Sequence, residues 1–239
     1  MSRSTRRAVL IALALLLALV VLLPLRIVFD AAGLGSRGVS ARAVEGSIWS
    51  GTVRDLRIGK LSLGDLDAGL SPAGLLGGEM VLNMTRAEDA PGQPPLAFTL
   101  ARSGDSIAIR EAVGEIATAD LFAPLPLRSV NLDGVNIGFD GRRCASASGA
   151  VRVNIEQSLF GVTLQRGLSG NLRCDGGDLL VPLQGQSGLE QLDIRIKGNG
   201  RYSADFRLGG LAASAGSALS ALGFRQQGDA MAIRINGRF

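Results

Sequence analysis

The chain contains no histidine among its 239 residues, and it has only one tryptophan and one tyrosine. Without histidine there is no Ser-His-Asp triad, no histidine zinc ligand and no imidazole general base. Other nucleophiles need an activating neighbour, and no serine–lysine pair stands at catalytic spacing. We therefore predict that the chain is not an enzyme, and we expect no cofactor, no metal and no catalytic residues.

A concentrated basic segment is also missing, although the chain is mildly basic. Its 25 Lys and Arg residues outnumber 21 acidic ones, which gives a net charge of +4. The longest basic runs are pairs, at residues 6–7 and 142–143. Nucleic-acid binding needs a basic stripe with aromatic stacking partners, so we expect no nucleic-acid partner.

The acidic residues are scattered, and the closest pair is Asp65 and Asp67 in the sequence Gly-Asp-Leu-Asp. A calcium loop needs a longer series of spaced oxygen ligands that ends in Glu, and this segment lacks one. We predict that both carboxylates lie in a solvated turn.

One long apolar run is present near the N-terminus. Residues 8–25 are 18 uncharged residues rich in Leu, Ala and Val. In a helix they would span about 27 Å, close to the hydrocarbon thickness of a bilayer. A cleaved signal peptide is the alternative, but its apolar region is normally shorter and ends at a small-residue cleavage site. We predict an uncleaved cytoplasmic tail and single-pass anchor within residues 1–29.

The remaining residues, 30–239, form the second predicted domain. Arginines flank the apolar run on both sides, so a charge count alone does not orient it. A short tail stays in the cytoplasm easily, whereas a long domain is translocated whatever its charge. We therefore expect an anchor in the bacterial inner membrane and a domain in the periplasm.

Beyond the anchor, apolar and polar residues alternate in short segments, which is typical of strands with one buried face. Residues 192–196 and 202–208 alternate on either side of Gly198-Asn199-Gly200, which predicts a β-hairpin. The alternation changes phase at Asp133-Gly134, which predicts a bulge or a tight turn. We predict a mainly β fold, in which antiparallel sheets form a sandwich or a curved prism.

One segment departs from this alternation. Leu211, Ala215, Leu219 and Leu222 follow helical spacing, and Gly223 stands where a C-terminal cap is expected. We predict a short helix or an ordered loop that lies over the sheet.

Cys144 and Cys174 are 30 positions apart, and each lies close to a glycine-rich segment. Their spacing matches no metal-binding pattern of cysteine pairs. In an oxidising compartment two such cysteines form a disulfide. We favour a disulfide over the alternative of two unrelated buried thiols.

A short glycine-bounded motif follows the predicted anchor. It consists of Gly46, Ser47, Ile48, Trp49, Ser50 and Gly51. A single tryptophan in a small β domain is usually a core anchor. We favour that role for Trp49, with a partner-facing surface position and ligand stacking as alternatives.

This motif resembles an element near the start of the type II secretion system protein N family, also called general secretion pathway protein N. The layout is also similar, with an N-terminal anchor, glycine-punctuated strands and a cysteine pair in the second half. The resemblance implies an accessory, non-enzymatic subunit of the envelope-spanning machine that exports folded proteins. It also implies that the chain sits in the inner membrane and contacts other secretion-system subunits through its periplasmic domain.

Lipid handling is the alternative function. A curved sheet with an apolar concave face, held at the inner membrane, would cradle the acyl chains of a lipid partner. The same alternation also predicts an ordinary closed core. An open apolar groove would favour lipid binding, and a closed core would exclude it.

Overall fold

The structure is a computed structural model that describes residues 10–11, 18, 22–31, 38–86, 93–118, 127–155, 158–159, 162–163, 167–211, 216 and 219–238. The helices with defined bounds are α2 (Leu25–Ala31) and α3 (Pro72–Leu76). The strands are β1 (Val39–Ser40), β2 (Ala43–Gly46), β3 (Gly51–Ile58), β4 (Leu61–Leu70), β5 (Met80–Arg86), β6 (Leu96–Ser103), β7 (Ser106–Ala117), β8 (Leu127–Asp140), β9 (Arg143–Ile155), β10 (Ser158–Leu159), β11 (Val162–Thr163), β12 (Leu168–Asn171), β13 (Arg173–Asp175), β14 (Asp178–Gln184), β15 (Glu190–Ile196), β16 (Arg201–Leu208), β17 (Arg225–Gln227) and β18 (Ala230–Arg238).

Nearly all described strands belong to one antiparallel sheet. Its order is β1-β3-β4-β5-β6-β7-β8-β9-β12-β14-β15-β16-β18-β17, with β2 beside β3 and β13 beside β14. The strands β10 and β11 pair only with each other. Most neighbours in the sheet are neighbours in the sequence, as expected when short turns connect antiparallel strands. The predicted mainly β, antiparallel class is confirmed.

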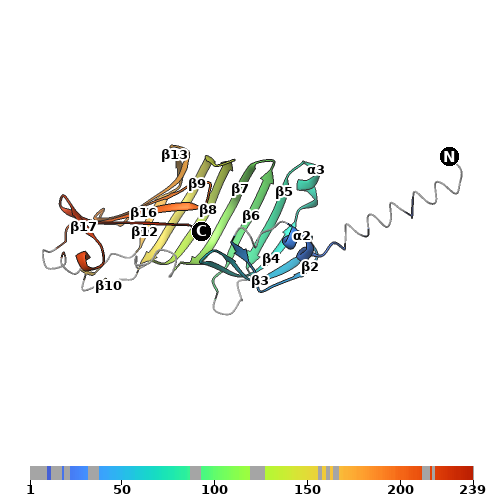
Figure 1. Ribbon diagram of the computed structural model, residues 1–239, viewed down its shortest axis with the longest axis horizontal. Coiled ribbons are helices and arrows are strands. Elements are labelled where there is room, and N and C mark those ends of the chain that lie inside the picture. The colour runs from blue at the N-terminus through green and yellow to red at the C-terminus, as the bar shows by residue number, and fades with distance from the viewer. Residues whose placement is uncertain are drawn as a thin grey trace.

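The sheet curls on itself. In Figure 1 the strands β5 to β9 run side by side across the middle, and β12, β16 and β17 lie to the left of them. Ile109 of β7 and Ile194 of β15 line one apolar cavity, although four strands separate β7 from β15 in the sheet. Only a curved sheet brings these residues together, so the fold is closer to the curved prism than to a sandwich of two separate sheets.

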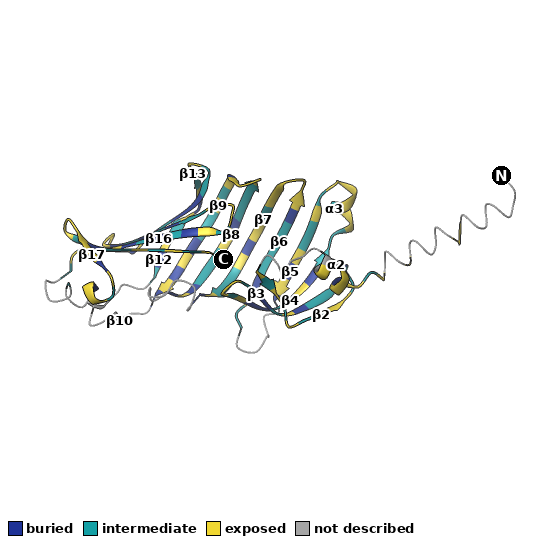
Figure 2. Ribbon diagram, viewed as in Figure 1, coloured by how far each residue is buried: buried dark blue, intermediate teal, exposed yellow. Residues whose placement is uncertain are grey.

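Two clusters of buried apolar side chains fill the inside of the curl. The larger cluster runs from β7 to β18 and includes Val153, Leu192 and Phe206, which are fully buried. The smaller cluster lies under β3 to β6 and includes Leu25 of α2. Figure 2 shows the buried and exposed bands that alternate along the central strands. This alternation places one face of each strand inside the curl and the other in solvent.

The predicted hairpin and the predicted phase change are both confirmed. In β16 the side chains of Tyr202, Ala204 and Phe206 are buried, and β15 pairs with β16 across the 198–200 turn. The β8–β9 register shifts between Asp133 and Asn136. Because this irregularity replaces one regular pairing, the apolar residues on both sides of it still face the interior.

Asp65 and Asp67 do not lie in a turn, so that prediction was wrong. Both residues belong to strand β4, which continues past a bulge at Gly64 (φ 74°). The backbone N–H of Asp55 donates to Asp65 Oδ1 at 2.7 Å. The Thr52 hydroxyl donates to Asp67 Oδ1 at 2.9 Å. These bonds to β3 hold the segment in an extended conformation. The Gly-Asp-Leu-Asp sequence by itself is typical of a turn, which is why a turn was predicted.

The N-terminal part of the described chain packs against the start of the sheet. Leu25 is only 8% exposed, and the backbone N–H of Ile48 donates to the carbonyl of Leu23 at 3.0 Å. Most of residues 8–25 lie outside the described residues. No described helix has both the length and the apolar character that a membrane crossing requires. Helix α2 runs across the proposed boundary at residues 29–30, so the anchor and the domain division stay predictions.

The predicted helix at residues 211–222 is described only in part. Residues 216 and 219–221 are helical, and Leu219 is fully buried in the larger cluster. Gly223 has a φ of 93°, and its N–H donates to the carbonyl of Ser220 at 3.0 Å. This geometry is that of a glycine that ends a helix.

Candidate functional surfaces

The 46–51 motif forms the turn between β2 and β3. Gly46 and Gly51 face each other as the last pair of the two strands. The backbone N–H of Ser47 donates to the carbonyl of Ser50 at 3.1 Å. In return, the N–H of Ser50 donates to the Ser47 hydroxyl oxygen at 3.2 Å. The two serines therefore close the turn with hydrogen bonds of their own.

The turn is held between two other segments of the chain. Ile48 is 6% exposed, and its carbonyl accepts a bond of 2.8 Å from the N–H of Leu70 at the end of β4. Its own N–H donates to Leu23, ahead of α2. Ile48 therefore joins the N-terminal segment to the sheet through both of its backbone groups.

Two glycines bound the motif for different physical reasons. Gly46 has a φ of 84°, which residues with a side chain rarely adopt. Gly51 has ordinary dihedral angles but no space for a side chain. A Cβ there would lie 2.5 Å from the carbonyl oxygen of Glu45 and 2.8 Å from Cδ2 of Leu25.

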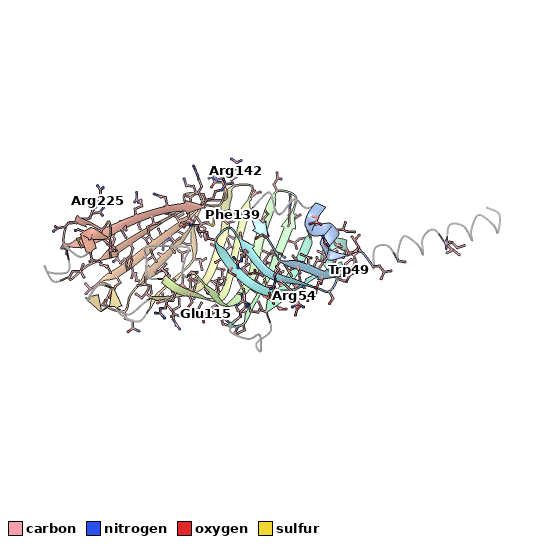
Figure 3. The ribbon with its side chains drawn as sticks, turned by 60° about the horizontal axis from the view of Figure 1, so that its bottom comes forward. Trp49, Arg54, Glu115, Phe139, Arg142 and Arg225 are labelled. Atoms are coloured by element: carbon pink, nitrogen blue, oxygen red, sulfur yellow. A yellow bond between two sulfur atoms is a disulfide. The ribbon has the colours of Figure 1, made fainter. Side chains whose placement is uncertain are left out.

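Trp49 is half-buried at the edge of the smaller cluster, near the N-terminal end of the sheet (Figure 3). It packs against the buried side chains of that cluster without being one of its buried members. It also borders a shallow depression of about 460 Å³, whose floor includes Asp67, Asn83 and Thr85. Trp49 thus packs only partly on the core, and its partner-facing and ligand-stacking alternatives stay predictions.

The predicted disulfide is present between Cys144 of β9 and Cys174 of β13. Strand β12 separates β9 from β14 in the main path and ends at Asn171, and β13 continues beside β14. The N–H of Cys144 also donates to the carbonyl of Gly177 at 2.8 Å. The disulfide thus joins β9 to the β13–β14 hairpin beyond the end of β12.

A basic surface on β15, β16 and β18 was not expected from the sequence. The strand registers place Lys197, Arg201 and Arg238 side by side on the outer face. Arg195 and Arg234 lie on the same face, and each contacts a carboxylate, of Asp175 and Asp205 respectively. The hydrogen bond to Asp205 raises the pKa of Arg234. Four of these cations belong to β15, β16 and β18, and Lys197 directly follows β15, so all five gather on one surface only once the strands pair.

The inside of the curl holds a small apolar cavity of about 210 Å³. Its wall consists almost entirely of aliphatic side chains from β4, β7, β8, β9, β14 and β15, including Ile137, Val151 and Val181. An apolar cavity of roughly 150 Å³ is enough to bind benzene or xenon. Pockets that bind drug-sized ligands have volumes of roughly 300–1,000 Å³, so this cavity suits only a short apolar group.

Arg86, at the end of β5, is a buried cation that is surrounded by backbone carbonyl groups. It is 7% exposed, and its guanidinium donates to the carbonyls of Pro94 at 2.6 Å and Leu63. A longer bond of 3.4 Å reaches the carbonyl of Glu115 on β7. Burial lowers the pKa of Arg86, while the negative charge of Asp65 acts in the opposite direction. Arg86 thereby joins β4, β7 and the segment before β6.

The motif and the disulfide are not brought together, because β2–β3 and β9–β13 lie in different parts of the sheet. Among the residues that the structure describes, no three His, Cys, Asp or Glu residues are placed to hold a metal ion. The described part of the chain is thus a mainly β domain with open depressions and a basic face on its outside and one small apolar cavity inside.

The chain belongs to the family of type II secretion system (T2SS) protein N, whose family model matches residues 37–234. The match includes the 46–51 turn, both cysteines and all but the last residues of the curled sheet. No curated protein and no solved structure matches the chain. The resemblance to this family is therefore confirmed.

Proposed function

We propose that the chain is an accessory structural subunit of a type II secretion system. In this proposal residues 1–29 hold it in the bacterial inner membrane, and residues 30–239 act in the periplasm by contacting other subunits of the machine. The family match over residues 37–234 is the observation that carries the proposal. The disulfide supports an oxidising compartment, because such bonds persist outside the cytoplasm.

The shape of the domain supports a contact role. A curled sheet keeps its backbone hydrogen bonds inside the sheet, while its outer face and its two edges remain available to partners. The depression beside Trp49 and the basic face lie towards opposite ends of the sheet order. One subunit would therefore contact two partners at once. Energy for transport would come from other subunits.

A deletion and complementation experiment tests this function. In a strain that lacks the gene, we expect the amount of secreted substrate in the medium to fall and periplasmic substrate to accumulate. The wild-type chain should restore secretion. A variant that lacks residues 8–21, and therefore the predicted anchor, should stay in the cytoplasm and should not restore secretion. Unchanged secretion in the deletion strain would contradict the proposed function.

Lipid handling is the second candidate, and the apolar cavity is the observation that favours it. The cavity of about 210 Å³ would take the end of one acyl chain but not a whole lipid tail. Mass spectrometry of lipids extracted from the purified chain tests this function. A stoichiometric phospholipid that is lost in an Ile137→Trp variant would support it, whereas an extract without bound lipid would exclude it.

A further inference from the structure

Three cations form a row across the outer face of the C-terminal strands. Arg201 of β16 faces Arg238 of β18 directly, and the N–H of Lys197 donates to the carbonyl of Arg201 at 2.8 Å. All three side chains are exposed. Like charges that face each other across strands destabilise a sheet. The row therefore carries a cost that an acidic partner would remove.

The neighbouring carboxylates do not neutralise this row. Asp175 pairs with Arg195, and Asp205 pairs with Arg234. Among the described residues, neither Lys197, Arg201 nor Arg238 has an acidic partner within ion-pair distance. The positive charge at this end of the face is thus uncompensated within the described chain.

The same residues surround an open depression of about 750 Å³. Its lining contains five cations and no carboxylate; they are Arg195, Lys197, Arg201, Arg234 and Arg238. Asn199, Ser203 and Asn236 add polar groups without charge. Arg195 and Arg234 already pair with carboxylates beside the depression, so the three remaining cations are the ones suited to the negative charges of a partner.

Strand β18 also has an open edge beside this depression. It pairs with β16 from Met231 to Arg238, which is all of the strand but its first residue. On its other side β17 pairs only as far as Ala232. Residues 233–238 therefore have no strand beside them on that side within the described chain. An open edge of this kind is a template for a strand of another protein.

Resting on the proposed function, we infer that β18 accepts an acidic, extended segment of a partner protein as an additional strand. The backbone of the segment pairs with the open edge at residues 233–238. Its acidic side chains face the row that Arg201 and Arg238 belong to, and its apolar side chains extend the inner face beside Ile233 and Ile235. Backbone pairing supplies the geometry, and the cationic row selects for negative charge.

A second copy of the chain is a poorer partner for this edge. The chain carries a net charge of +4, so a second copy would bring positive charge to a positive surface. In Figure 1 β17 lies at the end far from α2 and β2, and the C-terminus, where β18 ends, lies near the middle of the molecule.

A synthetic peptide tests the inference with the purified full-length chain. The probe is a fluorescent peptide of about ten residues, a common strand length, that alternates Glu with Val. The charge control alternates Lys with Val. Two further probes carry N-methyl groups, one on the odd-numbered amides and the other on the even-numbered amides. Only alternate amides of a paired strand point towards β18, so one of these two probes should lose its binding. Fluorescence anisotropy measures the dissociation constant of each probe.

The test variants are Arg201→Glu and Arg238→Glu, and the matched control is Arg152→Glu. Arg152 is an exposed arginine on the outer face of β9, so its substitution changes the net charge equally. Each test variant turns the facing arginine pair into an opposite-charge pair, which should leave the fold intact. We expect both variants to weaken binding of the Glu-Val peptide about tenfold, and the control to change it less than about twofold.

Several results would overturn the inference. These are equal binding of the Lys-Val peptide, full binding of both N-methylated probes, or binding only to phosphatidylglycerol vesicles or to a single-stranded oligonucleotide. The variants are also tested in the secretion assay, where we expect Arg201→Glu to lower secretion. If deletion of the gene abolishes secretion but the Arg201→Glu variant secretes normally, the inference is overturned and the proposed function stands. Normal secretion without the gene would overturn the proposed function as well.

Discussion

Removal of the disulfide should destabilise the domain by an amount that follows from the loop it closes. Cys144 and Cys174 are 30 positions apart in the chain. For a loop of this size, the chain-entropy relation gives a loss of about 12 cal/mol/K in the unfolded state, or about 3.6 kcal/mol at 25 °C. We expect a Cys144→Ala, Cys174→Ala double variant to lose about 3–4 kcal/mol of unfolding free energy.

Urea denaturation of the purified chain measures this loss. Trp49 is the only tryptophan and packs against the smaller cluster, away from the disulfide, whereas circular dichroism follows the whole sheet. If the sheet unfolds as one cooperative unit, both signals should give the same midpoint. Each single Cys→Ala variant should lose nearly as much stability as the double variant, because either substitution removes the same bond.

Two results would refute this reasoning. A loss below about 1 kcal/mol in the double variant would show that loop closure contributes little to stability. Single variants whose losses add up to that of the double variant would show that the two positions act independently. In that case packing at each cysteine, rather than the bond, would account for the effect.

Three further predictions concern other parts of the sheet. Gly51→Ala should destabilise the chain by about 1–3 kcal/mol in urea denaturation, because the new Cβ would overlap the carbonyl oxygen of Glu45. The control Gly216→Ala should leave the stability unchanged, because a Cβ at that position has open space. Arg86→Met should cost about 2–4 kcal/mol by the same assay, since buried carbonyl groups lose their donor; a neutral result would contradict this. Burial raises the pKa of Tyr202, the only tyrosine, so absorbance at high pH should show a folded midpoint above the midpoint in denaturant. The stability that the protonated Tyr202 contributes should be complete below about pH 10 and should be lost as the pH rises through the folded pKa. Equal titration midpoints in the folded and denatured chain would refute this prediction.

The alternation of apolar and polar residues was sufficient to predict the local strands. The β15–β16 hairpin followed from a regular period on both sides of a glycine-rich turn. The β8–β9 irregularity followed from a phase change at Asp133-Gly134. These features depend on residues that are close in sequence, where periodicity and turn chemistry determine the structure.

The features that depend on long-range pairing were not predictable in the same way. The curl places β7 opposite β15, and no local pattern specifies which strands meet across an interior. Asp65 was expected in a turn because its partner, the N–H of Asp55, lies on another strand. The basic face combines Lys197, Arg201 and Arg238, which become neighbours only once the strand registers are known.

In-cell photocrosslinking tests the central claim, that this domain acts by contacting other subunits of the secretion machine. A photoreactive amino acid is placed at Asn83, beside the depression that Trp49 borders, or at Asn236, on the basic face. Ser148, an exposed position of β9 outside both depressions, serves as the control. We predict adducts with other type II secretion subunits from at least one of the two test positions and none from Ser148. Adducts that contain only phospholipid, or the same adducts from all three positions, would contradict the account.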